Sequence, residues 1–200
     1  MGKINMYSQF ARPQGLPGWI AGWYMSRENR EINKWTIDFL NVQDGEHVLE
    51  IGFGSGKALK YILQQADEVR LTGVDVSEVM VYQTLRRLNK HLINSEILLM
   101  EGQADKLPLL SQKVDKVLVI NNVTFWETPV KTLRNIYSQM TEGGKIALTI
   151  RPHEKGATDD TSELIGGQLS ALLAQAGFTN IEFFLKPTKP TNTVCALGTK

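Results

Sequence analysis

Residues 48–56 of this 200-residue chain read Val48-Leu49-Glu50-Ile51-Gly52-Phe53-Gly54-Ser55-Gly56. The apolar residues around Glu50 predict a short buried strand, and helix-forming residues follow from Lys57 onward. The three glycines on alternate positions predict a tight turn between strand and helix, because glycine takes positive φ and lets a ligand approach the backbone closely. A strand, a glycine turn and a helix near the start of an α/β sheet indicate a site for a nucleotide-type cofactor.

Strands and helices alternate along the rest of the chain. Hydrophobic patterning and turn residues predict strands at 47–53, 69–74, 97–100, 114–120, 145–150, 181–185 and 194–197. They predict helices at 26–41, 57–65, 77–90, 129–140 and 163–176, with Gly143-Gly144 ending the fourth of these and Gly177 the fifth. This alternation predicts an α/β, Rossmann-like doubly wound fold. Its mostly parallel seven-stranded sheet would have an antiparallel C-terminal strand.

Composition narrows the class of protein. A hydrophobic fraction of 42%, a charged fraction of 22% and a net charge of +1 are typical of a globular protein and argue against a broad nucleic-acid footprint. The single cysteine, Cys195, excludes an internal disulfide and a multi-cysteine zinc site, and it favours a reducing cytoplasm. The N-terminus lacks a secretory signal pattern, and no run reaches the ~18 apolar residues of a membrane span, so we expect no stable membrane insertion.

Residues 1–25 form a separate feature. They combine aromatic side chains with closely spaced glycines and prolines, which excludes one regular helix as far as Gly18. Three interpretations stay open: an arm that packs on the domain surface, a lid over the glycine turn, or a patch that rests on lipid headgroups. Residues 26–200 are predicted to form a single domain.

Polar residues follow the next three predicted strands, at the edge of the sheet where ligands of parallel sheets bind. Asp75 ends the second strand, 19 residues beyond Gly56. Its carboxylate suits the two hydroxyls of a ribose, although a carboxylate near the start of a helix is also common. Asp105, after the third strand, either reads an adenine edge or lies in a solvated turn. Asn121 follows the fourth strand.

The glycine spacing and Glu50 select among cofactors. The dinucleotide fingerprint requires glycine or alanine three positions after its second glycine, and this place is taken by Lys57. A fixed negative charge at Glu50 repels a pyrophosphate but attracts an ammonium or sulfonium group. The residues therefore indicate a cationic cofactor with an adenosine end.

On these residues the chain resembles the class I S-adenosylmethionine-dependent methyltransferases, in the small-molecule group called methyltransferase type 11. Residues 48–56 match the family's E-x-G-x-G-x-G motif, and Val74-Asp75-Val76-Ser77 matches its second-strand acidic motif. Residues 102–108 match its adenine-edge segment, often G-D-A-x-x-L-P, and residues 133–150 contain its L-x-P-G-G stretch with Glu142 in place of proline. The resemblance covers roughly residues 30–200.

The resemblance implies S-adenosylmethionine as the cofactor and no metal. It assigns the glycine-turn residues to the methionine end, Asp75 to the ribose, the residues after the third strand to the adenine and Asn121 to the neighbourhood of the methyl group. The implied cofactor-binding residues are Glu50, Gly52, Phe53, Gly54, Gly56, Asp75, Val76, Ala104, Asp105 and Asn121. No catalytic residue is assigned; His153 is the best placed of the three histidines if its loop folds over the pocket.

The predicted function is transfer of a methyl group from S-adenosylmethionine to a small-molecule acceptor by in-line displacement, in a monomer or homodimer. Holding the acceptor and the methyl group in line can supply about 7–11 kcal/mol of the acceleration. One alternative is a short nicotinamide-dependent oxidoreductase, against which stand Lys57, Glu50 and the lack of a Tyr-x-x-x-Lys pair. A second is a non-catalytic cofactor-binding protein of methyltransferase type. The identity of the acceptor is not encoded in any motif.

Overall fold

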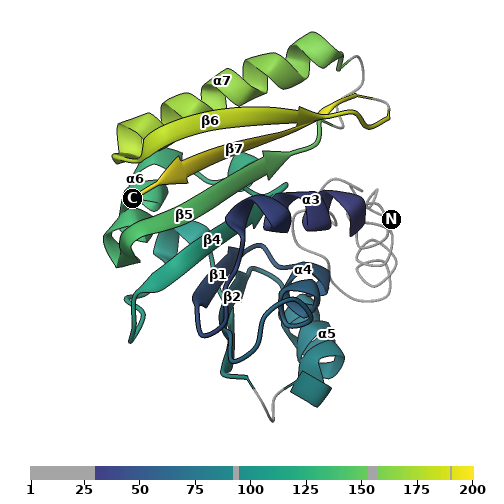
Figure 1. Cartoon of the computed structure of the whole chain (residues 1–200), viewed down its shortest axis with the longest axis vertical. Coiled ribbons are helices and arrows are strands. Elements are labelled where there is room, and N and C mark those ends of the chain that lie inside the picture. Colours follow the sequence, from purple (N-terminus) through teal and green to yellow (C-terminus); the bar gives the residue numbers. More distant parts are fainter. Residues whose placement is uncertain (1–29, 92–94, 153–156, 190) are drawn as a thin grey trace, which may run out of the picture.

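A computed structural model describes residues 30–91, 95–152, 157–189 and 191–200 (Figure 1). The predicted N-terminal arm over residues 1–25 and His153 lie outside the described residues. The interpretation of residues 26–200 as one domain therefore stays a prediction.

The described strands form one sheet. They are β1 (His47–Ile51), β2 (Arg70–Asp75), β3 (Ile97–Glu101), β4 (Val114–Ile120), β5 (Met140–Ile150), β6 (Thr179–Lys186) and β7 (Thr193–Thr199). Their order in the 7-stranded sheet is β3-β2-β1-β4-β5-β7-β6. The first five strands pair in parallel, whereas β7 pairs antiparallel with both β5 and β6. The predicted fold class is confirmed.

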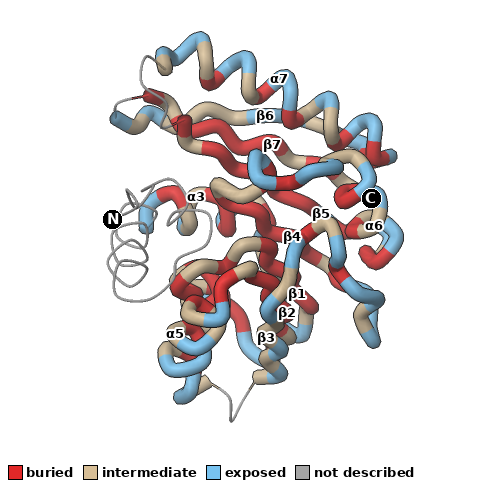
Figure 2. Tube along the Cα trace, turned by 180° about the vertical axis from the view of Figure 1, so that it is seen from behind, coloured by how far each residue is buried: buried red, intermediate tan, exposed pale blue. Residues whose placement is uncertain are grey.

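Helices cover both faces of this sheet, and its central strands are largely buried; β4, for example, is buried along nearly its whole length. The helices are α3 (Arg30–Leu40), α4 (Lys57–Ile62), α5 (Glu78–Leu88), α6 (Pro129–Gln139) and α7 (Asp159–Ala176), with the 3-10 turns η1 (Asn89–His91), η2 (Ala104–Lys106) and η3 (Val123–Phe125). Buried residues of α6 and α7 belong to one hydrophobic cluster, and those of α3, α4 and α5 to another. The central strands are accordingly mostly buried, whereas the helices show both buried and exposed residues (Figure 2).

The passage from α6 into β5 differs from the prediction. The helix ends at Gln139, and β5 begins directly at Met140, so that Gly143 and Gly144 lie inside the strand and do not end the helix. Met140 is 1% exposed and pairs with Val114 at the start of β4. Burying this side chain and pairing its backbone favour the extended conformation one turn earlier than the glycines do.

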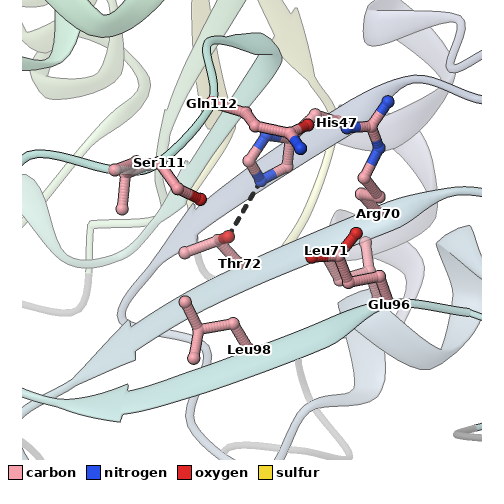
Figure 3. A pocket seen from close by; sticks show the side chains of 9 residues that line it. His47, Arg70, Leu71, Thr72, Glu96, Leu98, Ser111 and Gln112 are labelled. Carbon is pink, nitrogen blue, oxygen red and sulfur yellow. Dashed lines mark hydrogen bonds between the residues drawn. The ribbon is translucent and has the colours of Figure 1, made fainter.

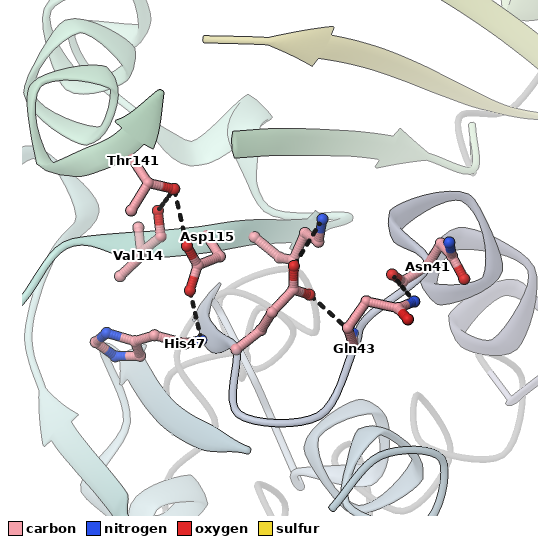
Figure 4. A network of polar contacts seen from close by, with 8 residues as sticks. Asn41, Gln43, His47, Val114, Asp115 and Thr141 are labelled. Atoms are coloured by element: carbon pink, nitrogen blue, oxygen red, sulfur yellow. Dashed lines mark hydrogen bonds and ion pairs between the residues drawn. The ribbon is translucent and has the colours of Figure 1, made fainter. Parts of the chain in front are cut away.

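The amino ends of the central strands are held by a network of paired polar groups (Figure 4). Asp115 accepts hydrogen bonds from the His47 amide at 2.9 Å and from the Thr141 hydroxyl at 2.8 Å. Glu46 accepts from the Gln43 amide at 2.8 Å and forms an ion pair with Lys116 at 3.2 Å. These contacts fix the entry into β1 against β4 and β5.

Within the described residues, no helix is long and apolar enough to cross a membrane.

Candidate active site

The glycine turn after β1 has the geometry that its sequence predicts. Gly52, Gly54 and Gly56 all have positive φ, at 78°, 50° and 69°. The Gly52 amide donates to the Val74 carbonyl at 2.7 Å, and the Gly56 amide donates to the Phe53 carbonyl at 2.9 Å. The first bond joins the turn to the end of β2, and the second closes the turn upon itself.

The three glycines differ in what surrounds them. A Cβ atom added at Gly52 would lie 2.2 Å from Nδ2 of Asn122, and one at Gly56 would lie 2.3 Å from Cγ2 of Thr84. A Cβ added at Gly54 would meet nothing within 4 Å. Gly52 and Gly56 therefore allow the protein to pack against itself, whereas Gly54 is where the turn presents bare backbone to open space.

Two further predicted cofactor-binding residues are Phe53, within this turn, and Val76, after β2. The Phe53 side chain is 4% exposed and packs against β2, where a Cβ at Gly73 would lie 2.7 Å from Phe53 Cδ1. Phe53 can therefore offer a ligand only its backbone. Val76 is half-buried between Asp75 and Ser77, just beyond β2.

Asp75 joins the glycine turn to the start of α5. Its Oδ2 accepts from the Gly54 amide at 2.8 Å, and its Oδ1 accepts from the Ser77 amide at 3.0 Å. Burial raises the pKa of Asp75, against the opposing effect of these two amide donors. Each carboxylate oxygen has a second lone-pair direction, so these bonds leave capacity for hydroxyl groups of a ligand.

Glu50 is the anomalous polar group of the site. It lies near the carboxyl end of β1, is 3% exposed, and its Oε2 has no hydrogen-bond partner among the described residues. Burial, together with repulsion from Asp75, raises the pKa of Glu50 from 4.5 to about 8. A buried carboxyl oxygen without a partner is costly and calls for an explanation, of which a bound ligand is one.

The segment after β3 lies beside the end of β2, because the Gly102 amide donates to the Asp75 carbonyl at 2.9 Å. Ala104 is buried there. The Asp105 carboxylate, however, accepts from the amides of Glu127 at 3.0 Å and Thr128 at 3.4 Å, just before α6, and from the Thr132 hydroxyl.

Burial alone would raise the pKa of Asp105, but the hydrogen bonds from Thr132, Glu127 and Thr128 outweigh it and lower the pKa. Asp105 therefore has a structural role at the start of α6. Its predicted contact with an adenine stays a prediction.

The residues after β4 close the site on its other side. Asn121 has a positive φ of 51°, and its Oδ1 accepts from the Arg151 amide at 2.8 Å, beyond the end of β5. Asn122 contacts the Gly52 backbone, and its Oδ1 accepts from the Trp126 indole at 2.7 Å. Asn122 thus joins the glycine turn to Trp126, directly after η3, a role that its place in the sequence does not reveal.

Two residues of α5 also contact the glycine turn and were not predicted. The Thr84 hydroxyl donates to the Gly54 carbonyl at 3.0 Å, and the Arg87 guanidinium donates to the Ser55 carbonyl. The pattern Val81, Leu85 and Leu88 predicts the inner face of this helix, but the buried residues are Met80, Thr84 and Leu88, and Leu85 is 40% exposed. The buried face contains a threonine, and a prediction that follows only apolar residues therefore selects the wrong face of the helix.

The two described histidines lie away from this site. His91 ends η1. His47 lines a pocket at the opposite, amino-terminal edge of the sheet, together with Arg70, Thr72, Ser111 and Gln112 (Figure 3). Its Nδ1 donates to the Lys113 carbonyl, which can only accept, at 2.9 Å, and its Nε2 lies within hydrogen-bond distance of the Thr72 hydroxyl, at 2.8 Å.

No group of three potential metal-ligating side chains occurs in the part of the chain that the structure describes.

Comparisons with known proteins agree with this architecture. Residues 48–144 match the family described as a methyltransferase domain. The uncharacterized methyltransferase YdaC of Bacillus subtilis (strain 168) is 36% identical over 181 residues, which cover 90% of this chain and 98% of that protein. The chain therefore belongs to the class I S-adenosylmethionine-dependent methyltransferases and is an enzyme of that class, whose cofactor is S-adenosylmethionine.

Solved structures show the same fold. A chain of the complex between the Haloferax volcanii Trm112 methyltransferase activator and its methyltransferase superposes with a TM-score of 0.72 at 19% identity, over 91% of this chain and 94% of that one. The N-methyltransferase NodS from Bradyrhizobium japonicum WM9, in complex with S-adenosylhomocysteine, gives a TM-score of 0.66 at 16% identity over 86% of each chain. Membership of the methyltransferases rules out the oxidoreductase alternative.

Proposed function

We propose that this methyltransferase methylates a small-molecule acceptor, and that its cofactor binds across the glycine turn at the carboxyl ends of β1, β2, β3 and β4. The observation that carries the proposed cofactor site is Glu50, whose buried Oε2 has no partner among the described residues. A cation placed beside this oxygen would supply the missing partner and favour the ionised carboxylate.

The site residues fit S-adenosylmethionine in charge and shape. Glu50 and Asp75 are two buried acidic groups behind the turn, which suits a ligand with ammonium and sulfonium groups. Gly54 leaves the backbone open to close approach. Asp75 retains acceptor capacity for ribose hydroxyls, and Ala104 lies beside the same strand end, where an adenine would be placed.

The cofactor supplies an activated methyl group when it is bound. The chain's own contribution is then to hold and align the acceptor, which can account for most of the acceleration. Asn121 is proposed to lie next to the reacting groups, because its side chain is fixed to the end of β5 by the Arg151 amide. No described residue stands out as a general base, and the proposed mechanism requires none for an acceptor that is already deprotonated.

Two properties favour a small acceptor over RNA. The net charge of +1 provides no excess of cations to neutralise phosphates. Phe125, in η3 directly after β4, is 55% exposed and offers an apolar surface near the proposed reaction centre. We also propose that the protein is cytoplasmic and is a monomer or a homodimer.

Cofactor binding is tested with Gly54→Ala and its matched control Gly45→Ala. Both glycines have positive φ, and a Cβ at either would meet nothing within 4 Å. Both variants should therefore lose a similar stability, about 1 kcal/mol. Only Gly54→Ala should weaken binding of S-adenosylmethionine and S-adenosylhomocysteine in isothermal titration calorimetry. Equal affinities of the two variants, or no binding by the unmodified chain, would contradict the proposal.

The acceptor class is tested separately. The chain is incubated with methyl-labelled S-adenosylmethionine and either a panel of small amines, alcohols and thiols or ribosomal RNA. Label in a small molecule supports the proposal, and label in RNA alone refutes it.

A further inference from the structure

Helix α5 contacts the glycine turn through two neighbouring carbonyl groups. Thr84 donates to the carbonyl of Gly54 at 3.0 Å, and Arg87 donates to the carbonyl of Ser55. The two donors are three residues apart on α5, so they project from the same face of the helix. We name Thr84 and Arg87 the α5 clamp.

The clamp completes the restraint of the turn. The Gly54 amide is held by Asp75, the Gly54 carbonyl by Thr84, the Ser55 carbonyl by Arg87, and the Gly56 amide by the Phe53 carbonyl. Because each peptide unit is planar, fixing one of its polar groups fixes the other on the opposite side. Three consecutive peptide units, from the one between Phe53 and Gly54 to the one between Ser55 and Gly56, are thereby oriented.

This restraint matters because glycines lose the most conformational freedom on folding. A turn with alternate glycines would sample several backbone shapes without it, and a ligand would have to select one of them at a cost in affinity. The clamp is built into the protein: Thr84 is 0% exposed and lies against Gly56, where any Cβ would clash with it.

Arg87 is an unexpected donor for this place. Burial lowers the pKa of Arg87, which shows that its guanidinium is partly withdrawn from water. A positive charge does not help to attract a cationic cofactor. Its hydrogen bond to the Ser55 carbonyl therefore explains its position better than a direct electrostatic role does.

We propose that Thr84 and Arg87 are positioning residues that hold the glycine turn in its binding shape before the cofactor arrives, and thereby set the affinity for S-adenosylmethionine. This inference rests on the proposed cofactor site, but its first half concerns the ligand-free chain alone. The start of α5 supports it, because Asp75 binds the Gly54 amide and the Ser77 amide with its two oxygens. The helix and the turn should therefore move as one unit.

The test uses four variants of the full chain. Thr84→Val and Arg87→Gln weaken the clamp, and Thr84→Ser keeps the hydroxyl. The matched control is Arg86→Ala, on the exposed side of the same helix, where Arg86 lies over the Tyr82 ring at 5.7 Å.

Amide hydrogen exchange of residues 54–56 is measured without ligand, and affinity for S-adenosylmethionine by calorimetry. Thr84→Val and Arg87→Gln should each raise exchange and weaken affinity by about tenfold, the value of one hydrogen bond. Thr84→Ser and Arg86→Ala should stay close to the unmodified chain.

Each outcome is decisive. Unchanged exchange in both Thr84→Val and Arg87→Gln overturns the clamp, and faster exchange with unchanged affinity overturns its link to the cofactor. If Thr84→Val does not fold, Arg87→Gln alone decides, since Arg87 is only half-buried. An unmodified chain that binds no S-adenosylmethionine contradicts the proposed function, while the exchange data still decide whether α5 holds the turn.

Discussion

Ionisable groups with little exposure lie at both the amino ends and the carboxyl ends of the parallel strands, which we call the amino edge and the carboxyl edge. The two edges differ in whether these groups have hydrogen-bond partners. At the amino edge, both carboxylate oxygens of Asp115 and both ring nitrogens of His47 have hydrogen-bond partners. At the carboxyl edge, Glu50 is more deeply buried than His47, at 3% against 8% exposure, and its Oε2 has no partner among the described residues.

This difference separates structure from function. Native proteins satisfy nearly all buried polar groups, so a fully paired network such as that around Asp115 needs only a structural explanation. The amino edge holds a pocket, yet the polar groups that line it at His47 and Thr72 are bonded to each other (Figure 3). A pocket whose polar groups are already bonded to each other indicates a ligand less strongly than a buried carboxyl oxygen without a partner beside open glycine backbone.

The largest expected effect concerns Glu50 and pH. Its pKa of about 8 in the folded chain lies above the ordinary 4.5, so the folded chain keeps a proton that the unfolded chain has lost. The free energy of unfolding should therefore fall as pH rises from about 5 to about 8, by as much as ~1.4 kcal/mol per pH unit, and level off above. Urea denaturation of the ligand-free chain at several pH values measures this slope.

Glu50→Gln serves as the matched variant, because it keeps the shape of the side chain and cannot ionise. It should lose most of the slope, be more stable than the unmodified chain at pH 8, and bind S-adenosylmethionine at least tenfold more weakly. A slope that persists in Glu50→Gln would mean that other groups carry the pH dependence and that the contrast between the two edges is smaller than we infer.

The second effect is that of Gly52→Ala. It combines a left-handed backbone with a clash against Asn122 and should lower the free energy of unfolding by about 3 kcal/mol. Gly143→Ala is the control, because Gly143 has a similar φ of 76° but no neighbour within 4 Å of an added Cβ; it should cost about 1 kcal/mol. Equal losses in urea denaturation would show that Asn122 yields to the new methyl group.

The smallest effect is expected from Asp115→Ala at the amino edge. It removes the acceptor of the His47 amide and the Thr141 hydroxyl, and it should cost about 2 kcal/mol of stability. Affinity for S-adenosylmethionine should not change at a temperature where the variant is folded, since this network lies at the edge away from the glycine turn. A loss of affinity there would show that the two edges are coupled.

The strand pattern of the sequence was sufficient for the architecture. The run at 114–120 coincides with β4, and the expected closing strands became β6 and β7. The boundary before β5 was predicted wrongly, because a glycine pair is a strong local signal, whereas the burial of Met140 and its pairing with Val114 depend on distant residues. Local signals place elements well and their ends less well.

In the candidate site, too, local sequence patterns identified residues but did not establish their contacts. Glu50, the three glycines and Asp75 could be identified from the sequence because their spacing is a local property of one strand, one turn and the next strand end. The structure joins them, through the bond from the Gly54 amide to Asp75. Their roles toward the cofactor remain predictions, as do those of Ala104 and Asn121.

What the sequence by itself determined is the alternation of strands and helices, the positive-φ turn and the two acidic residues, Glu50 and Asp75, at the strand ends beside it. Only the tertiary structure decided that Thr84 and Arg87 bond to this turn, that Asp105 bonds to the start of α6, and that the Glu50 Oε2 has no protein partner among the described residues. The physical reason is that a hydrogen bond between distant residues produces no periodic pattern in the sequence. It exists only where two elements are packed together, and at α5 the residue that makes it is a threonine within an otherwise apolar stripe.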